Sequence, residues 1–242
     1  MSDESEVLIV DAGNTSIKYT AFRGEQVLWV ERGEVPPIKT EFTPQRIYFA
    51  SVRSQEQSAL LHADIKAALP NAEWLSLTST AQACGVINAY FEPERLGIDR
   101  WLSVVAAYHL GGNKIVLDAG TAIKLDFVNQ QGEHLGGYIT PGLKMMESSL
   151  LANTARIRYL PDEVKLADTL PNSTARAVVE GVHEMALAFI ERVKAQHPTF
   201  QWVATGGDAK ALLESLDITM DYQPHLVAMG AKRVGDELLK RQ

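Results

Sequence analysis

The chain has 242 residues, 46% of them hydrophobic and 22% charged, and its formal net charge is −7. This composition suits a globular protein with an ample core, and the acidic balance argues against a broad nucleic-acid-binding surface. No apolar run approaches the roughly 18 residues that span a bilayer, and the start MSDESE is unlike a signal peptide. Cys84 is the single cysteine. We therefore expect a cytoplasmic protein without a membrane or nucleic-acid partner.

The first half of the chain begins with a predicted strand triplet. A buried strand over 7–11 is followed by a turn and a strand over 15–22, whose alternation indicates one solvent-exposed face. A third strand over 26–31 completes the triplet. The elements predicted next are a strand at 46–52, a helix at 55–69, a strand at 73–77 and a helix beginning at Gly97-Ile98-Asp99-Arg100, with Trp101, Val104, Val105 and Tyr108 facing inward.

The second half repeats this pattern. Strands are predicted at 114–118, 122–129, 134–140 and 199–204, and helices at 143–151, 174–196, 209–216 and 227–240. Residues 153–173 are the least patterned, and we expect a mobile loop there. Strand triplets followed by alternating helices and strands, twice over, predict an α/β protein of two like halves, 1–112 and 113–242.

Two short segments carry the strongest signal of this duplication. DAGNTSIK at 11–18 and DAGTAIK at 118–124 each follow an apolar run. When Asn14 is left out, six of the seven aligned positions are identical. Two related halves, each with a strand, a tight turn and a second strand, can hold a nucleotide between them.

The residues of the first segment suit phosphate binding. Gly13 lets backbone N–H groups approach phosphate oxygens, and Asn14 and Thr15 add side-chain donors. Asp11 ends a buried strand, where a lone carboxylate is costly, and a Mg²⁺ ion would offset that cost. The alternative is a plain hairpin with an Asx turn, and the presence of two matching copies favours the phosphate site.

Lys18 and Lys124 lie on the second strands of the two segments. Each is either a cation that neutralises phosphate charge or a solvated lysine on a strand face. The pattern slightly favours the phosphate role for Lys18 and the solvated role for Lys124.

Two further motifs stand at helix starts. Asp99 could cap the helix that begins at 97–100 or accept a hydroxyl proton, and Arg100 could fork onto a carboxylate or phosphate. Gly206 and Gly207 allow close approach of a ring or phosphate, or simply form a tight strand–helix turn. No His/Cys cluster has metal-ligand spacing, and the Gly-x-x-x-x-Gly-Lys-Ser/Thr phosphate loop does not occur.

The ordered set DAGNTSIK, GIDR, DAGTAIKLD, GGYITPG and TGGDA, spread over nearly the whole chain, resembles type III pantothenate kinases of the acetate and sugar kinase/Hsp70/actin superfamily. The resemblance implies duplicated ribonuclease H-like halves, each a mixed sheet with helices, with the nucleotide in the cleft between them. It also implies ATP-dependent phosphorylation of pantothenate at its 4′-hydroxyl, the first step of coenzyme A biosynthesis.

Residue roles follow from the resemblance. Asp99 would be the catalytic base, Asp11 would hold Mg²⁺, and Asp118 would hold a monovalent cation, K⁺ or NH₄⁺. The implied ATP-binding residues are Asp11, Ala12, Gly13, Asn14, Thr15, Ser16, Ile17, Lys18, Thr121, Gly206 and Gly207. The implied pantothenate-binding residues are Tyr90, Gly97, Ile98, Asp99, Arg100 and Thr174. Whether Thr174 serves its own subunit or the partner in a homodimer stays open.

One position departs from the family pattern. Where this chain has Lys124, the family more often shows threonine, so the need for a monovalent cation and the role of Asp118 stay open. Two other functions also remain: another small-molecule kinase of the superfamily, or a non-catalytic nucleotide-binding transcription accessory factor. The accessory factor would be expected to lose Asp99 or one of the phosphate turns, and this chain keeps them.

Overall fold

The computed structural model describes residues 5–37 and 39–241, which form two compact units. Unit 1 contains the residues up to Gly112, with Asp126–Gly136 and the C-terminal residues from His225. Unit 2 contains Asn113–Leu125 and Gly137–Pro224. The predicted halves meet at the same point, 112/113, but they assign 126–136 and the C-terminal helix to the second half, whereas both pack in unit 1.

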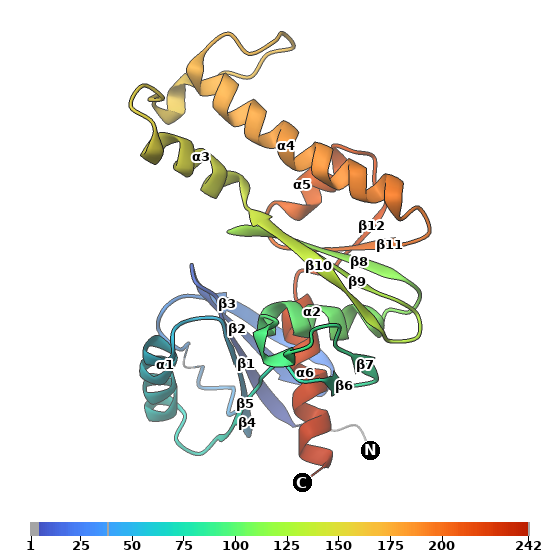
Figure 1. The fold of residues 1–242 in the computed structure, drawn as a ribbon. Helices are drawn as coiled ribbons and strands as arrows, with labels where there is room; N and C mark the ends of the chain where they lie inside the picture. The colour runs from blue at the N-terminus through green and yellow to red at the C-terminus, as the bar shows by residue number, and fades with distance from the viewer. Residues whose placement is uncertain (1–4, 38, 242) are drawn as a thin grey trace. The chain divides into compact units, whose positions relative to one another are not determined.

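Unit 1 is built on a five-stranded mixed sheet (Figure 1). Its strands are β1 (Glu6–Ala12), β2 (Ile17–Arg23), β3 (Gln26–Arg32), β4 (Arg46–Ser51) and β5 (Glu73–Ser76). They lie in the order β3-β2-β1-β4-β5. The first three are antiparallel neighbours, while β4 runs parallel to β1 and β5 parallel to β4. The predicted strand triplet is therefore confirmed.

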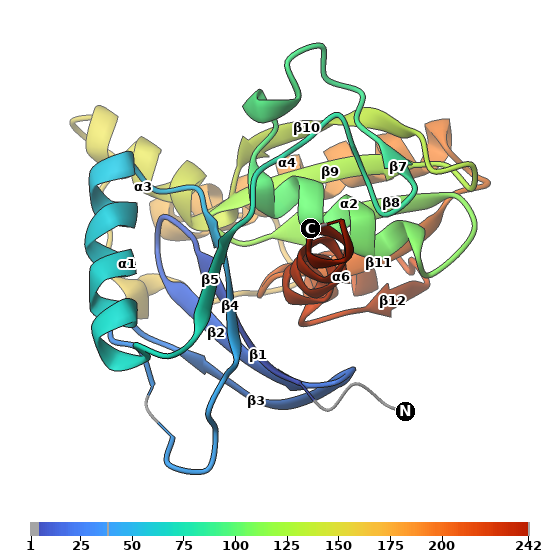
Figure 2. The same ribbon diagram turned by 90° about the horizontal axis from the view of Figure 1, so that it is seen from below.

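Helices cover both faces of this sheet (Figure 2). Leu61 and Ile65 of α1 (Gln55–Ala68) pack in one core cluster with apolar side chains of β1, β2 and β4. On the other face, α6 (Leu226–Lys240) contacts β1 and β4 and packs closely on α2 (Ile98–Tyr108). Gly230 makes this close packing possible, because a Cβ there would lie 1.9 Å from the carbonyl oxygen of Leu102.

The two-sided cover corrects two predictions for unit 1. β2 has no solvent-exposed face: Tyr19 lies in the α1 core, and Thr20, on the opposite face, is 1% exposed. The inward positions predicted on α2 are buried except Tyr108, which is half-buried, and the burial extends around nearly the whole helix. The short strands β6 (Gln82–Ala83) and β7 (Val86–Ile87) and the 3₁₀ helix η1 (Pro93–Arg95) were not predicted.

Unit 2 carries the repeat of the sheet. Its strands are β8 (Lys114–Ala119), β9 (Ala122–Val128), β10 (His134–Pro141), β11 (Gln201–Thr205) and β12 (Met220–Tyr222), and the outer ends of β9 and β10 are counted with unit 1. Their order, β10-β9-β8-β11-β12, matches the first sheet strand for strand, and β11 again runs parallel to the first strand of its triplet. This repeated order confirms the duplicated α/β fold. The three-residue β12 was not predicted.

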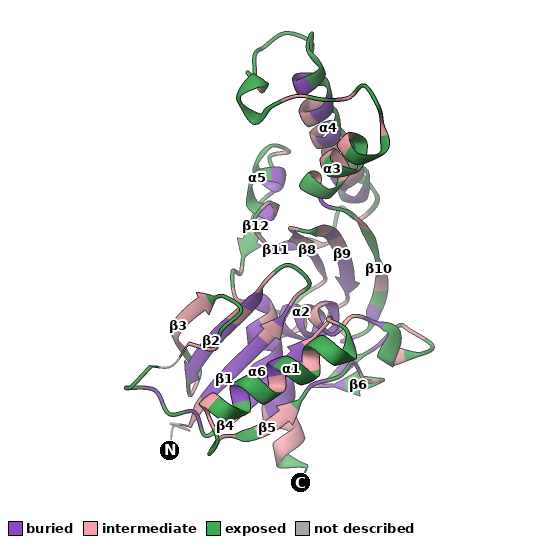
Figure 3. Ribbon diagram, turned by 90° about the vertical axis from the view of Figure 1, so that its left-hand side faces the viewer, coloured by how far each residue is buried: buried purple, intermediate pink, exposed green. Residues whose placement is uncertain are grey.

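The helices of unit 2 are α3 (Leu143–Asn153), α4 (Thr174–Gln196) and α5 (Ala209–Glu214). α4 spans the predicted residues, and Ser173 caps it by accepting a hydrogen bond from the Arg176 N–H. A buried stripe along α4 contrasts with α3, which has no buried residue (Figure 3). The predicted loop at 153–173 contains the 3₁₀ helix η2 (Pro161–Glu163). Within the described ranges, no helix combines the length and apolar character required to cross a bilayer.

Candidate functional site

The first Asp-Ala-Gly turn lies where β1 and β4 both end. The N–H of Gly13 donates to the carbonyl of Ser16 at 3.1 Å, and the N–H of Val52 donates to the carbonyl of Ala12 at 3.1 Å. The turn is thus closed on itself and joined to the chain that leaves β4. Carboxyl ends of parallel strands are a common place for ligand sites in α/β folds.

Side chains of this first turn face two environments. Ala12 and Ile17 are buried in the core, so only their backbone groups could meet a ligand. Asn14 and Thr15 are exposed. Asp11 and Lys18 stand directly opposite each other on β1 and β2.

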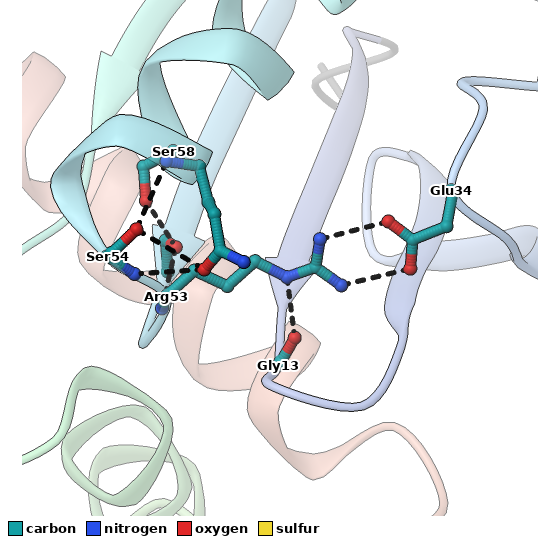
Figure 4. A network of polar contacts seen from close by, with 7 residues as sticks. Gly13, Glu34, Arg53, Ser54 and Ser58 are labelled. Atoms are coloured by element: carbon teal, nitrogen blue, oxygen red, sulfur yellow. Dashed lines mark hydrogen bonds and ion pairs between the residues drawn. The ribbon is translucent and has the colours of Figure 1, made fainter.

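Arg53, for which no role was predicted from the sequence, holds this turn in place (Figure 4). Its Nε donates to the carbonyl of Gly13 at 2.7 Å, while Nη1 and Nη2 contact Glu34 at 2.9 and 3.0 Å. Hydrogen bonding to Arg53 lowers the pKa of the Glu34 carboxyl. A usable signal was present: Arg53 follows a predicted strand directly and precedes a Ser-x-x-Gln capping box that begins at Ser54.

The second turn, residues 118–121, gathers motifs that are far apart in the sequence. The N–H of Gly142 donates to the carbonyl of Thr121 at 3.0 Å, and the N–H of Asp208 donates to the carbonyl of Ala119 at 3.1 Å. The Pro-Gly segment that opens α3 and the Gly-Gly turn before α5 therefore both pack against this turn. The structure thus brings Asp118, Thr121 and Gly206, predicted as site residues, together in unit 2.

The glycines around the second turn are of two kinds. A Cβ on Gly142 would lie 2.0 Å from the carbonyl oxygen of Gly120, and a Cβ on Gly206, where φ is +87°, would lie 2.2 Å from that of Ala119. The fold itself requires glycine at those positions. In contrast, a Cβ on Gly120 or Gly207 would have no atom within 4 Å, so a ligand could approach the backbone there.

This difference gives a paired prediction. Gly206→Ala should lower the free energy of unfolding by about 1–3 kcal/mol through backbone strain alone. The clash of the new Cβ with the carbonyl oxygen of Ala119 should lower it further. Gly207→Ala should change it by less than about 0.5 kcal/mol, as is usual for exposed sites. Urea unfolding measures both. Equal destabilisation by the two variants would contradict the packing described.

Asp118 has a charged partner within unit 2. Its Oδ2 lies 2.6 Å from Nζ of Lys124, and the two side chains are 22% and 18% exposed. The solvated-lysine interpretation of Lys124 is therefore wrong, because β9 places its ammonium on the aspartate at the end of β8. A second monovalent cation at the same carboxylate oxygen does not fit these residues. No group of three or more His, Cys, Asp or Glu side chains suited to a metal ion occurs among the residues the structure describes.

In unit 1, the Gly-Ile-Asp-Arg segment begins α2. The helix is capped by Gly97 and not by Asp99, so the cap interpretation of Asp99 is wrong. Asp99 is the second helical residue, and its Oδ1 accepts the N–H of Arg100 at 2.8 Å, which satisfies one of the unpaired donors of the first turn. A Cβ on Gly97 would lie 2.9 Å from that Oδ1, so the glycine leaves room for the carboxylate.

Arg100 makes the bidentate contact that its sequence context suggested, and its partner is a carboxylate of the protein itself. Nε and Nη2 contact the two oxygens of Asp126 at 2.8 and 2.6 Å, and Nη1 donates to the hydroxyl of Tyr90 at 2.9 Å. The side chains of Arg100 and Asp126 are only 5% and 3% exposed. The guanidinium thereby ties Tyr90, a predicted substrate residue, to the first turn of α2.

His134 completes this network. Nε2 lies 3.1 Å from Oδ1 of Asp126, and Nδ1 accepts the N–H of Ala89 at 3.4 Å. This pairing selects the neutral tautomer with the proton on Nε2. Burial alone would raise the pKa of the Asp126 carboxyl, but the hydrogen bonds from His134 and Arg100 outweigh it and hold that pKa below its usual range.

Asp126 ends the segment DAGTAIKLD, but no role was predicted for it from the sequence, and none was predicted for His134. A signal was available for both residues. Asp126 is a lone acidic residue in the otherwise apolar second part of β9, and His134 begins the neighbouring strand β10. Thr174, in contrast, is an exposed first residue of α4 and has no described contact with the other predicted site residues.

Comparison with known proteins identifies the family. A family model for type III pantothenate kinases matches residues 34–196. A type III pantothenate kinase from Marinomonas sp. (strain MWYL1) is 67% identical over 241 residues, covering 99% of each chain.

Two solved structures share the fold. One, from Campylobacter jejuni, is provisionally described as a Baf family transcriptional activator (24% identity, TM-score 0.59, 96% of this chain and 99% of that chain). The other, from Listeria monocytogenes, is provisionally described as an N-acetylmannosamine kinase (11% identity, TM-score 0.54, 98% and 100%). At these identities they support the duplicated fold alone. The family match and the full-length relative place this chain in the type III pantothenate kinase family.

Proposed function

We propose that this chain transfers the γ-phosphoryl group of ATP to the 4′-hydroxyl of pantothenate with Mg²⁺, the first step of coenzyme A biosynthesis. The chain is a kinase by family membership. The observation that carries the proposal is the 67% identity to a type III pantothenate kinase along 99% of both chains. Pantothenate and ATP are therefore the substrates to test first.

In the proposed mechanism, Asp99 acts on the nucleophile. Its carboxylate takes the proton of the 4′-hydroxyl as the hydroxyl oxygen forms a bond to the γ-phosphorus. The bond from that phosphorus to the β–γ bridging oxygen breaks, and ADP leaves with the electron pair. The N–H of Arg100, which contacts Oδ1 of Asp99, fixes the carboxylate at the start of a buried helix. This positioning is what phosphoryl transfer chiefly requires of a protein.

The first turn would hold the phosphates and the divalent ion. Asp11 offers a carboxylate at the end of β1, beside the exposed side chains of Asn14 and Thr15. This oxygen donor fits Mg²⁺, which proteins bind through one or two carboxylates together with substrate phosphates. Mg²⁺ would neutralise charge on the phosphate oxygens during transfer. Lys18, opposite Asp11 in the hairpin, would add a positive charge.

The second turn and the network around Arg100 would complete binding. The open space at Gly120 and Gly207 supports contact of these backbones, and of Thr121 beside them, with ATP. Tyr90, held by Arg100, would line the pantothenate site together with the residues at the start of α2.

The homodimer remains a proposal, supported by apolar side chains on unit 2. Tyr138 and Ile139 of β10, Met145 of α3 and Met185 of α4 are between 46% and 65% exposed, and α4 is the helix that begins at Thr174. Water-exposed apolar surface of this kind is typical of an interaction face. Sedimentation equilibrium should give a dimer mass, and a fully active monomer would contradict a role for Thr174 across subunits.

A substrate screen tests the proposed reaction. ADP release from ATP and Mg²⁺ should depend on pantothenate and should stay at background with sugars and short carboxylic acids. Release with a sugar or an acetate-like carboxylate, and not with pantothenate, would favour another kinase of the superfamily.

A further inference from the structure

The contact between Lys124 and Asp118 is the starting point. The ammonium nitrogen lies 2.6 Å from Oδ2 of the aspartate, and both side chains are more than three-quarters buried. The pair lies beside the Gly206 turn, since a Cβ on Gly206 would be 2.7 Å from Oδ1 of the same carboxylate. This ion pair is therefore enclosed by β8, β9 and the turn before α5, and is shielded from solvent far more than a surface pair would be.

The position of the lysine follows from the duplicated hairpin. Lys18 and Lys124 occupy matching places in the two segments, as do Asp11 and Asp118. In the first hairpin, Asp11 and Lys18 stand opposite each other across β1 and β2. Opposite charges in facing positions of a strand pair attract each other. In unit 2 this attraction is realised as the observed contact between Lys124 and Asp118.

A further cation has no favourable place at this carboxylate. A monovalent ion bound to Oδ2 of Asp118 would lie close to the ammonium of Lys124, and the repulsion between two like charges rises as their separation falls. A potassium ion and an ammonium group carry the same charge, so one can replace the other electrostatically.

We propose that the Lys124 ammonium supplies, as part of the chain, the monovalent positive charge at Asp118, and that the kinase consequently works without added K⁺ or NH₄⁺. This inference rests on the proposed pantothenate kinase function. It predicts a fixed charge where the family resemblance implies an exchangeable ion.

The activity test compares three proteins with and without K⁺. The wild-type rate with pantothenate, ATP and Mg²⁺ should agree within about twofold between KCl and tetramethylammonium chloride of equal ionic strength. Lys124→Thr, which keeps a residue suited to a strand, should lose at least about tenfold in tetramethylammonium and recover in KCl or NH₄Cl. Lys66→Ala, an exposed lysine of α1, is the charge-loss control and should behave as wild type.

Thermal melting gives a readout that does not depend on catalysis. KCl should raise the melting temperature of Lys124→Thr above the value in tetramethylammonium chloride, and it should leave that of the wild type unchanged, because only a protein that binds the ion is stabilised by it. A wild type that requires K⁺ for activity, or that is stabilised by K⁺, would overturn the inference. So would a folded Lys124→Thr that neither loses activity nor responds to K⁺.

The two proposals can fail separately. If no protein turns over pantothenate in any salt, the proposed function fails, and the melting comparison still decides the inference. If Lys124→Thr does not fold, the wild-type comparison between salts decides it.

Discussion

Asp99→Asn is expected to fold like the wild type and to lose about 10²–10⁴-fold in kcat, the usual contribution of a general base. The asparagine keeps an oxygen that can accept the Arg100 N–H now bound by Oδ1 at 2.8 Å, so the start of α2 stays intact. Its neutral amide, however, cannot take the hydroxyl proton of the substrate. Initial rates with pantothenate, together with a urea unfolding curve, measure both effects.

The control for this prediction is Glu94→Gln, which removes a carboxylate from the exposed helix η1 shortly before α2. This variant should retain wild-type kcat and stability. Near-normal turnover by Asp99→Asn would remove Asp99 from the role of base, whereas a large loss of stability would mean that its carboxylate is structural.

The second large effect concerns stability. Asp126→Asn should lower the free energy of unfolding by about 3–5 kcal/mol, because it leaves the charge of Arg100 buried without a counter-charge. The side chain of Arg100 is 5% exposed, and both of its contacts with Asp126 are shorter than 2.9 Å. The double replacement Arg100→Met/Asp126→Leu should recover much of this loss, since it removes both charges together.

An exposed ion pair provides the matched comparison. Glu92→Gln breaks the Arg95–Glu92 pair, whose side chains are 74% and 58% exposed, and should cost less than about 1 kcal/mol. Urea unfolding followed by circular dichroism measures all of these variants. If Asp126→Asn lowered the free energy of unfolding no more than Glu92→Gln, the buried network would not make the contribution to stability assigned to it.

The same carboxyl should affect stability in acid. Its pKa in the folded protein is lowered, so its contribution is fully present above the ordinary aspartate pKa of about 3.9 and is lost as the pH falls through the lower folded-state pKa. The stability difference between wild type and Asp126→Asn should therefore be constant near neutral pH and shrink below about pH 4. A difference that persists unchanged in acid would contradict this.

Much of the fold could be predicted because local signals were strong. The two Asp-Ala-Gly turns follow apolar runs, and the predicted bounds of α4 match the structure since Ser173 caps its start and an apolar stripe continues along it. Long-range packing could not be predicted. Whether α6 joins unit 1 depends on Gly230 and Gly235, which let it approach α2 and the ring of Tyr48.

The candidate site shows the same difference between local signals and long-range contacts. Single-residue roles could be proposed from motifs, but their partners could not be, because they come from distant positions. Arg100 and Asp126 are 26 residues apart, and Arg53 and Gly13 are 40 apart. The cap interpretation of Asp99 failed because the N-cap lies two residues earlier, at Gly97, whose small size makes room for the Asp99 carboxylate.

The measurement that tests the central claim most directly is identification of the product. Purified protein incubated with pantothenate, ATP and Mg²⁺ should yield one phosphate monoester on the 4′-oxygen of pantothenate, seen by phosphorus NMR and mass spectrometry, with one ADP formed for each ester. Hydrolysis of ATP without the ester, or an ester formed on another acceptor in preference to pantothenate, would contradict the assignment.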